Sequence, residues 1–99
     1  MFDHIRAWLK EKGITDNSNP MAQWSKMLEE VNELRSAITR DDINEITLEG
    51  GDVMVTLIST LQQCGVEAED ALAAAYAKIA KRDGKMIDGK FVKAEDLVK

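Results

Sequence analysis

On the C-terminal side of the single proline of the chain, apolar residues recur with the spacing of one face of an α-helix. Each helical residue is rotated by about 100° from the previous one, so residues with this spacing form a continuous stripe. Asn19 is suited to cap such a helix, and Pro20 is suited to its first position. The sequence therefore predicts one long amphipathic helix that begins at Pro20. Its stripe consists of Met21, Trp24, Met27, Leu28, Val31, Leu34 and Ile38.

Three further segments have a helical pattern, and turn-forming residues separate them. The first spans about 3–12 and ends at Gly13. Another spans about 42–64. Its stretch 53–60 could also form a strand, but the apolar pattern is longer than a typical strand, which favours a helix. The last segment is rich in alanine and spans about 67–82, with acids at its start and bases at its end.

The C-terminal part differs from the helical segments. Asp88-Gly89 stands between two short apolar runs, which is a strong signal for a two-residue β-hairpin. A chain of 99 residues has the usual size of one domain. We therefore expect a single all-α domain over residues 1–99, an antiparallel four-helix bundle-like fold with a short C-terminal β-hairpin.

Charge and composition exclude several function classes. With Lys+Arg 13 against Asp+Glu 18, the net charge of -5 disfavours binding to nucleic acid or to an anionic membrane. The interleaved charges of the first residues offer no apolar segment for secretion, so we expect a cytoplasmic protein. One cysteine and one histidine cannot form a zinc site. Any bound metal must therefore be held by oxygen atoms.

Two pairs of acidic residues are candidates for such a metal site. Glu30 and Glu33 share one flank of the helix that begins at Pro20, and Glu49 and Asp52 are three apart in the next, largely apolar helix. A short connection should make the two helices antiparallel neighbours and bring the four carboxylates together. Sites of carboxylates alone suit Mg²⁺ or Mn²⁺, and Mg²⁺ often completes its coordination with substrate phosphates. The alternative is an ordinary solvated acidic face.

Glu49 and Asp52 have further features that favour a site. They lie among apolar residues, and no basic residue lies within one turn of either in the sequence. Gly50 and Gly51 stand between them, at a cost of roughly 1 kcal/mol each in a helix. We expect close helix packing or an approaching ligand to need that space.

These residues resemble a known family. Glu29-Glu30-x-x-Glu33 followed by Glu49-x-x-Asp52 is similar to the EExxE and ExxD motifs of MazG-like all-α nucleoside triphosphate pyrophosphohydrolases. The resemblance extends from Pro20 to Asp96 and includes the flanking residues Gln23, Lys26, Lys78, Arg82, Gly84 and Lys85 and the segment 91–93. It implies an enzyme that cleaves a nucleoside triphosphate into a monophosphate and pyrophosphate.

The resemblance also implies a role for each motif residue. Glu30, Glu33, Glu49 and Asp52 would be the catalytic ligands of Mg²⁺, with Mn²⁺ as a possible substitute, and Glu29 would support them without binding the ion itself. The candidates for phosphate contacts are Lys26, Lys78 and Arg82, whose alternative role is that of solvated bases.

Four questions stay open. Tyr76 stands where many family members carry asparagine, so the sugar or base preference does not follow from the resemblance. Trp8 is undecided between base stacking and packing, whereas Trp24 lies in the apolar stripe and is expected in the core. A homodimer or homotetramer is expected, because so apolar a third helix needs more cover than one chain offers. The alternative functions are a phosphoribosyl-ATP pyrophosphohydrolase and a non-catalytic helical adaptor.

Overall fold

A computed structural model describes residues 1–97 of the chain. It is mainly helical, with one short two-stranded sheet near the C-terminus. The residues cluster into two compact units, Met1–Glu69 and the residues from Asp70 onward, which are described separately below. The single domain expected over residues 1–99 stays a prediction. No helix within residues 1–97 is long and apolar enough to cross a membrane.

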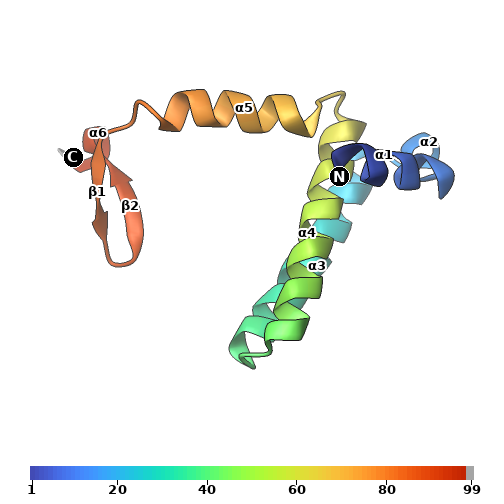
Figure 1. The fold of residues 1–99 in the computed structure, drawn as a ribbon, viewed down its shortest axis with the longest axis horizontal. Coiled ribbons are helices and arrows are strands. Elements are labelled where there is room, and N and C mark those ends of the chain that lie inside the picture. The colour runs from blue at the N-terminus through green and yellow to red at the C-terminus, as the bar shows by residue number, and fades with distance from the viewer. Residues whose placement is uncertain (98–99) are drawn as a thin grey trace. The chain divides into compact units, whose positions relative to one another are not determined.

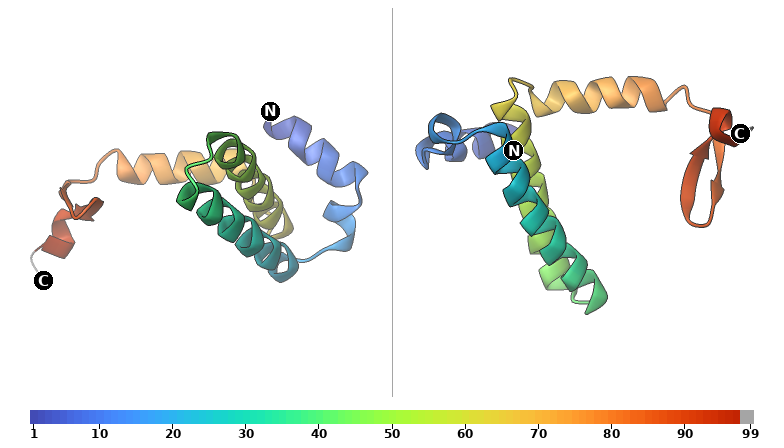
Figure 2. Two further views of the ribbon diagram at one scale, coloured as in Figure 1. Left: turned by 90° about the horizontal axis from the view of Figure 1, so that it is seen from below. Right: turned by 180° about the vertical axis from the view of Figure 1, so that it is seen from behind.

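A hairpin of two long helices dominates the first unit. Helix α3 (Pro20–Thr39) and helix α4 (Ile43–Gln63) lie side by side and antiparallel, as Figures 1 and 2 show. The side chains of Asn19 and Asp42 cap them by accepting a hydrogen bond from the backbone N–H three residues on, at 2.9 Å and 3.2 Å. Both helices, the Asn19 cap and the antiparallel packing are therefore as predicted from the sequence.

The two helices bury only part of their apolar residues against each other. Met27 and Ala37 of α3 and Ile58 of α4 are buried. Trp24 was expected in the core but is 42 % exposed, because the stripe on α3 is wider than the face that α4 covers. A broad apolar surface therefore remains on this hairpin in the single chain. It includes Met21, Leu28, Val31 and Ile38 of α3 and Leu48, Met54 and Leu57 of α4.

Two short helices precede the hairpin. Helix α1 (Phe2–Glu11) matches the prediction and contacts α4, with Leu9 only 1 % exposed. Helix α2 (Ile14–Asn17) was not predicted. It begins at Gly13, whose φ of 79° lets the chain turn sharply, and the Asn17 amide donates a hydrogen bond back to the Gly13 carbonyl at 2.8 Å. Figure 1 shows both helices beside the end of the hairpin where α3 starts.

Helix α5 (Ala68–Ile79) leads into the second unit and ends about one turn before the predicted end near residue 82. Strands β1 (Gly84–Ile87) and β2 (Lys90–Lys93) form the predicted antiparallel hairpin. Its turn has positive φ angles at both central residues, as a two-residue turn of this kind requires.

A last short helix, α6 (Ala94–Leu97), follows the β-hairpin and was not predicted. The prediction of a mainly helical chain that ends in a β-hairpin is thus confirmed. Of the expected four-helix bundle-like packing, the antiparallel α3–α4 pair and the contact of α1 with α4 are observed.

Candidate metal centre

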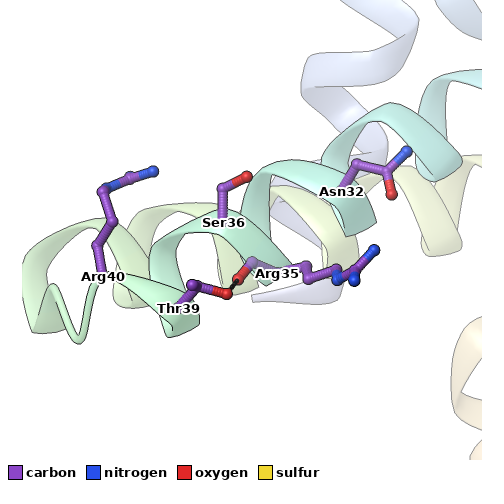
Figure 3. A pocket seen from close by; sticks show the side chains of 5 residues that line it. All are labelled: Asn32, Arg35, Ser36, Thr39 and Arg40. Carbon is purple, nitrogen blue, oxygen red and sulfur yellow. Dashed lines mark hydrogen bonds between the residues drawn. The ribbon is translucent and has the colours of Figure 1, made fainter.

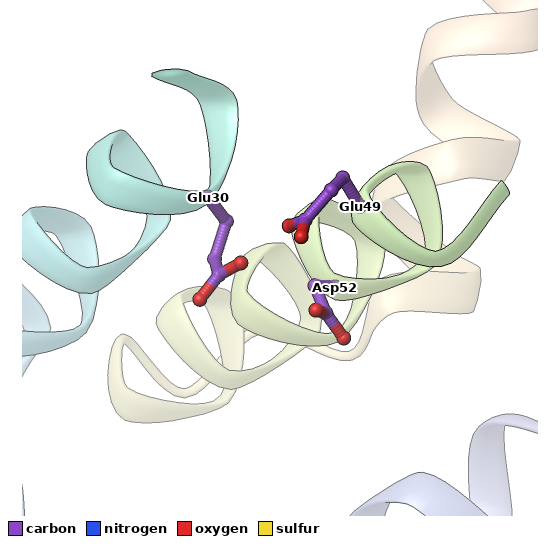
Figure 4. Close-up of side chains that lie close together, drawn as sticks. All are labelled: Glu30, Glu49 and Asp52. Atoms are coloured by element: carbon purple, nitrogen blue, oxygen red, sulfur yellow. The ribbon is translucent and has the colours of Figure 1, made fainter. Parts of the chain in front are cut away.

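Three carboxylates converge between α3 and α4. Glu30 extends from α3, and Glu49 and Asp52 extend from successive turns of α4 (Figure 4). Each offers one oxygen atom, and these three oxygens all lie within 4.8 Å of one another. The arrangement follows from the fold, because antiparallel packing sets the position of Glu30 opposite the Glu49-x-x-Asp52 pair. It is compatible with one hard divalent cation, which prefers carboxylate oxygens.

Glu49 is the least favourably placed of the three carboxylates without a cation. Its Oε2 atom is buried and has no hydrogen-bond partner. Burial raises the pKa of Glu49, and the nearby carboxyl groups of Glu30, Asp52 and Glu33 raise it further. Buried carboxylates are stable when they are paired or coordinate a metal. The charged form of Glu49 is therefore penalised in the folded chain, and either a proton or a bound cation would relieve that cost.

The other predicted residues of this flank lie around the cluster. The Nζ atom of Lys26 lies 3.5 Å from the carboxylate of Glu30 and 3.8 Å from the carboxylate of Glu29. The side chain of Glu30 is only 16 % exposed. Glu33 is exposed and is not part of the three-carboxylate cluster, although its charge acts on Glu49. Glu33 lies about 60° further round the helix than Glu30, and thus further from α4. The metal-binding roles of these residues stay predictions.

A hollow of about 210 Å³ adjoins the carboxylates within the first unit. Glu30 and Asp52 form part of its lining, together with Lys26. The rest of the lining is apolar or carries neutral polar groups. These residues are Trp8 and Leu9 of α1, Ile14 of α2, Gln23 of α3, and Val55, Thr56 and Ser59 of α4.

The polar group of Gln23 is held in a fixed orientation. Ser59 donates a hydrogen bond to its Oε1 atom at 2.7 Å, and its Nε2 atom donates one to the Ser18 hydroxyl at 2.9 Å. These bonds join α4, α3 and the segment before α3. The amide is thus positioned by the fold and offers a fixed polar group at the wall of the hollow.

A second hollow of about 290 Å³ is also lined by Trp8, Asp52 and Val55. The other residues that line this hollow are His4 and Ile5. One face of α1 therefore contributes three of the five lining residues. The sequence analysis left Trp8 undecided and did not assign His4 to a site. Their shared helical face was a visible signal, but the contact between α1 and α4 could not be read from the sequence.

A third hollow lies on the outer face of the C-terminal half of α3 (Figure 3). It is lined by Asn32, Arg35, Ser36, Thr39 and Arg40, and Figure 3 shows these side chains along a single helix. The Thr39 hydroxyl donates to the backbone carbonyl of Arg35 at 2.9 Å. This surface contains no carboxylate and carries two arginines, so it is not suited to a cation.

The second unit contains the other predicted phosphate contacts. Lys78 and Arg82 line one hollow together with Lys81 and Lys93. The sequence analysis did not assign Lys81 or Lys93 to a site. Lys93 belongs to the β-hairpin, and only the fold brings it to the same hollow as Lys78. Four cationic side chains around one hollow are suited to an anion. The same hollow also contains Asp83, Ala94 and Glu95.

The two glycines between Glu49 and Asp52 have a simpler environment than expected. A Cβ atom built on Gly50 or Gly51 would meet no other atom within 4 Å, apart from the backbone of its own helix and its chain neighbours. Close packing within the single chain therefore does not explain them.

Comparison with protein families decides the relationship. The model of the MazG nucleotide pyrophosphohydrolase domain matches residues 19–87, which is well over half of the chain. The chain belongs to the MazG family. No curated protein and no solved structure matches it.

The MazG match includes all three converging carboxylates and both predicted basic residues of the second unit, Lys78 and Arg82. It begins at Asn19, so α1 and α2 lie outside it. The apolar wall that α1 adds beside the acidic cluster is therefore a feature of this chain that the family match does not describe.

Proposed function

We propose that this MazG protein is a Mg²⁺-dependent nucleoside triphosphate pyrophosphohydrolase. The substrate would be a ribo- or deoxyribonucleoside triphosphate, and the products would be the monophosphate and pyrophosphate. The observation that carries the proposal is the convergence of Glu30, Glu49 and Asp52 inside the region matched to the family. The buried Glu49 oxygen without a partner supports a cation at this position.

In this proposal Glu30, Glu49 and Asp52 hold the cation, and Glu33 joins them when substrate is present. A bound Mg²⁺ supplies charge neutralisation for the phosphates and lowers the pKa of an attacking water. Lys26 lies 3.5 Å from Glu30 and balances part of the negative charge. Its ammonium group can also donate to a phosphate oxygen at the edge of the hollow.

We infer that the hollow beside the carboxylates receives the nucleoside part of the substrate. Trp8 is 46 % exposed and offers an aromatic surface, and the oriented amide of Gln23 offers a hydrogen-bonding group. Replacing Trp8 by alanine should raise KM about tenfold, since stacking on an aromatic side chain contributes about 1–3 kcal/mol per base, while kcat should change little. Steady-state kinetics measure both constants.

Trp8→Phe is the matched control, because it keeps an aromatic surface and should restore most of the affinity. An unchanged KM in Trp8→Ala would contradict the nucleoside role of this hollow.

The basic hollow of the second unit is proposed to bind the phosphate chain. Replacing Arg82 by alanine should lower kcat/KM about tenfold, because arginine can donate two hydrogen bonds to one phosphate group. The control is Lys90→Ala, an exposed lysine of β2 that does not line the hollow. Equal kinetics in Arg82→Ala and the parent would show that Arg82 is a solvated base.

We also propose that the protein is a homodimer or homotetramer. The support is the apolar surface of α3 and α4 that the single chain leaves exposed. Sedimentation velocity measures the oligomeric state, and a monomer at micromolar concentration would refute this part.

The experiment that tests the function is incubation with a panel of nucleoside triphosphates and phosphoribosyl-ATP in the presence of Mg²⁺. Chromatography should separate monophosphate and pyrophosphate from diphosphate and orthophosphate. Formation of the first pair from a nucleoside triphosphate, abolished by chelation, is the expected result. Turnover of phosphoribosyl-ATP alone would favour that alternative, and no turnover at all would favour a helical adaptor.

A further inference from the structure

Arg6 of α1 is the centre of a charged network that involves the connection between α4 and α5. Its guanidinium donates hydrogen bonds to both carboxylate oxygens of Glu69, at 2.7 Å and 2.6 Å. It also lies 3.4 Å from Glu67 and 2.7 Å from Asp3. The side chain of Arg6 is 17 % exposed and that of Glu69 is 45 % exposed, so this two-bond arrangement is only partly shielded from solvent.

The charges in this network are stable at neutral pH. Hydrogen bonds from Arg6 lower the pKa of Glu69 to about 2, so Glu69 is ionised throughout the range in which most enzymes work. Arginine is ionised over the same range. The pair therefore acts as a constant link between α1 and the start of α5, within the first unit.

The opposite side of α1 contributes to the hollows beside the carboxylates. Arg6 and Trp8 are two residues apart, so their side chains are separated by about 200° around the helix axis. Trp8 lines both hollows that Asp52 also lines. Leu9 is the only buried residue of α1. Phe2 and Ile5 are half-buried, so the apolar face sets the position of α1, and a directional bond on the far side of the helix adds a constraint on the rotation about its axis.

Other contacts of α1 do not supply this rotational constraint. Lys10 pairs with Asp16 at 2.8 Å, but both side chains are more than half exposed, and the pair joins α1 only to α2. The segment after α1 is held by Gln63, whose Nε2 donates to the backbone carbonyls of Ile14 and Thr15 at 3.1 Å each. These contacts fix α2. Arg6 joins α1 directly to Glu69, at the start of α5, through two side-chain hydrogen bonds.

We propose that Arg6 is a positioning residue. It pairs with Glu69 and Glu67 and so holds α1 in the rotation that keeps Trp8 at the wall of the hollow beside the carboxylates. The inference rests on the proposed function for its effect on substrate binding. Its structural part concerns only the orientation of Trp8. Arg6 lies in α1, which the family match does not reach, whereas Glu67 and Glu69 lie within the match.

The kinetic test compares Arg6→Gln with the parent enzyme. We expect KM to rise about tenfold, in line with the loss of a charge-assisted hydrogen-bonded pair, while kcat stays within about twofold of the parent. The charge-reversed double variant, Arg6→Glu with Glu69→Arg, is made in an Asp3→Asn and Glu67→Gln background, because the new carboxylate would otherwise face the two acids that contact Arg6. It should restore KM to near the parent value. Lys10→Gln removes the exposed pair of the same helix and should leave both constants unchanged.

A second readout does not require turnover. In a Trp24→Phe background, Trp8 is the remaining tryptophan of the chain, so acrylamide quenching of fluorescence reports its exposure alone. Arg6→Gln should quench at least about twice as fast as the background protein, and the charge-reversed double variant should return to the background rate. Far-ultraviolet circular dichroism should show that the helices of Arg6→Gln are still formed.

The outcomes separate the two proposals. Faster quenching that the reversed pair restores supports the positioning role, whether or not any triphosphate is hydrolysed. Equal quenching in Arg6→Gln and the background protein overturns it, even in an active enzyme. A loss of kcat with KM unchanged in Arg6→Gln also overturns it, because a positioning effect on Trp8 must change substrate binding.

Discussion

Replacing Asp52 by asparagine should lower kcat by about a thousandfold, of the order seen when one group that stabilises developing charge is removed. The amide nearly keeps the shape of the side chain but removes a charge from the three-carboxylate cluster. Steady-state assays over a range of Mg²⁺ concentrations should show the loss and should not recover it at high Mg²⁺. In the absence of metal, the variant should melt no lower than the parent, because it carries less like-charge repulsion.

Asp70→Asn is the matched control for this prediction. Asp70 is an exposed residue of α5 outside the cluster, and the chemical change is the same. Its kcat should stay close to that of the parent. Full activity in Asp52→Asn would show that the acidic cluster is an ordinary charged surface.

Mg²⁺ should stabilise the folded protein strongly. A ligand that binds only the folded state, at a hundred times its Kd, adds about 2.7 kcal/mol, which for a domain of this size raises Tm by more than about 10 °C. Differential scanning calorimetry with increasing Mg²⁺ measures the effect. K⁺ at equal ionic strength should raise Tm much less, because it only screens charges.

The stabilisation should depend on pH through Glu49. The pKa of this carboxyl is raised in the folded protein, so below its ordinary value of 4.5 it is protonated in both states and costs nothing. As pH rises above that value, the charged form is penalised in the folded state, and the metal-free protein loses stability. Mg²⁺ binds the ionised form, so its effect on Tm should grow over the same range.

Glu49→Gln separates this group from the others. The variant should have a higher Tm than the parent in metal-free buffer at neutral pH, and the difference should vanish below pH 4.5, where the parent carboxyl is protonated. It should also lose most of the response to Mg²⁺. A parent-like response to Mg²⁺ in Glu49→Gln would contradict the role of this carboxylate.

The helical hairpin and its acidic cluster could be predicted because they depend on local signals. Asn19 and Asp42 are capping residues followed by long apolar patterns, and the short connection leaves antiparallel packing as the simple result. The convergence of Glu30 with Glu49 and Asp52 follows from helical periodicity together with that packing. Glu33 was grouped with them because helical periodicity predicts which residues share a flank of α3. It does not predict how much of that flank faces α4.

Other features depend on contacts that the sequence does not reveal. The contact of Arg6 with Glu69 joins residues 63 positions apart, and the position of α1 beside Asp52 depends on such contacts. Helix α2 depends on a bond from Asn17 back to Gly13 in a segment that otherwise has the composition of a loop. The exposure of Trp24 could not be predicted either, since a helical stripe does not say how many neighbours cover it.

We propose that Glu30, Glu49 and Asp52 form a divalent cation site. Isothermal titration calorimetry with Mg²⁺, and with Mn²⁺ as a second probe, measures this binding without any substrate. We predict saturable binding to the parent protein and to Asp70→Asn, and at least about a tenfold weaker affinity in Asp52→Asn. Equal binding curves for the parent and Asp52→Asn, or no binding to the parent at millimolar metal, would contradict the account.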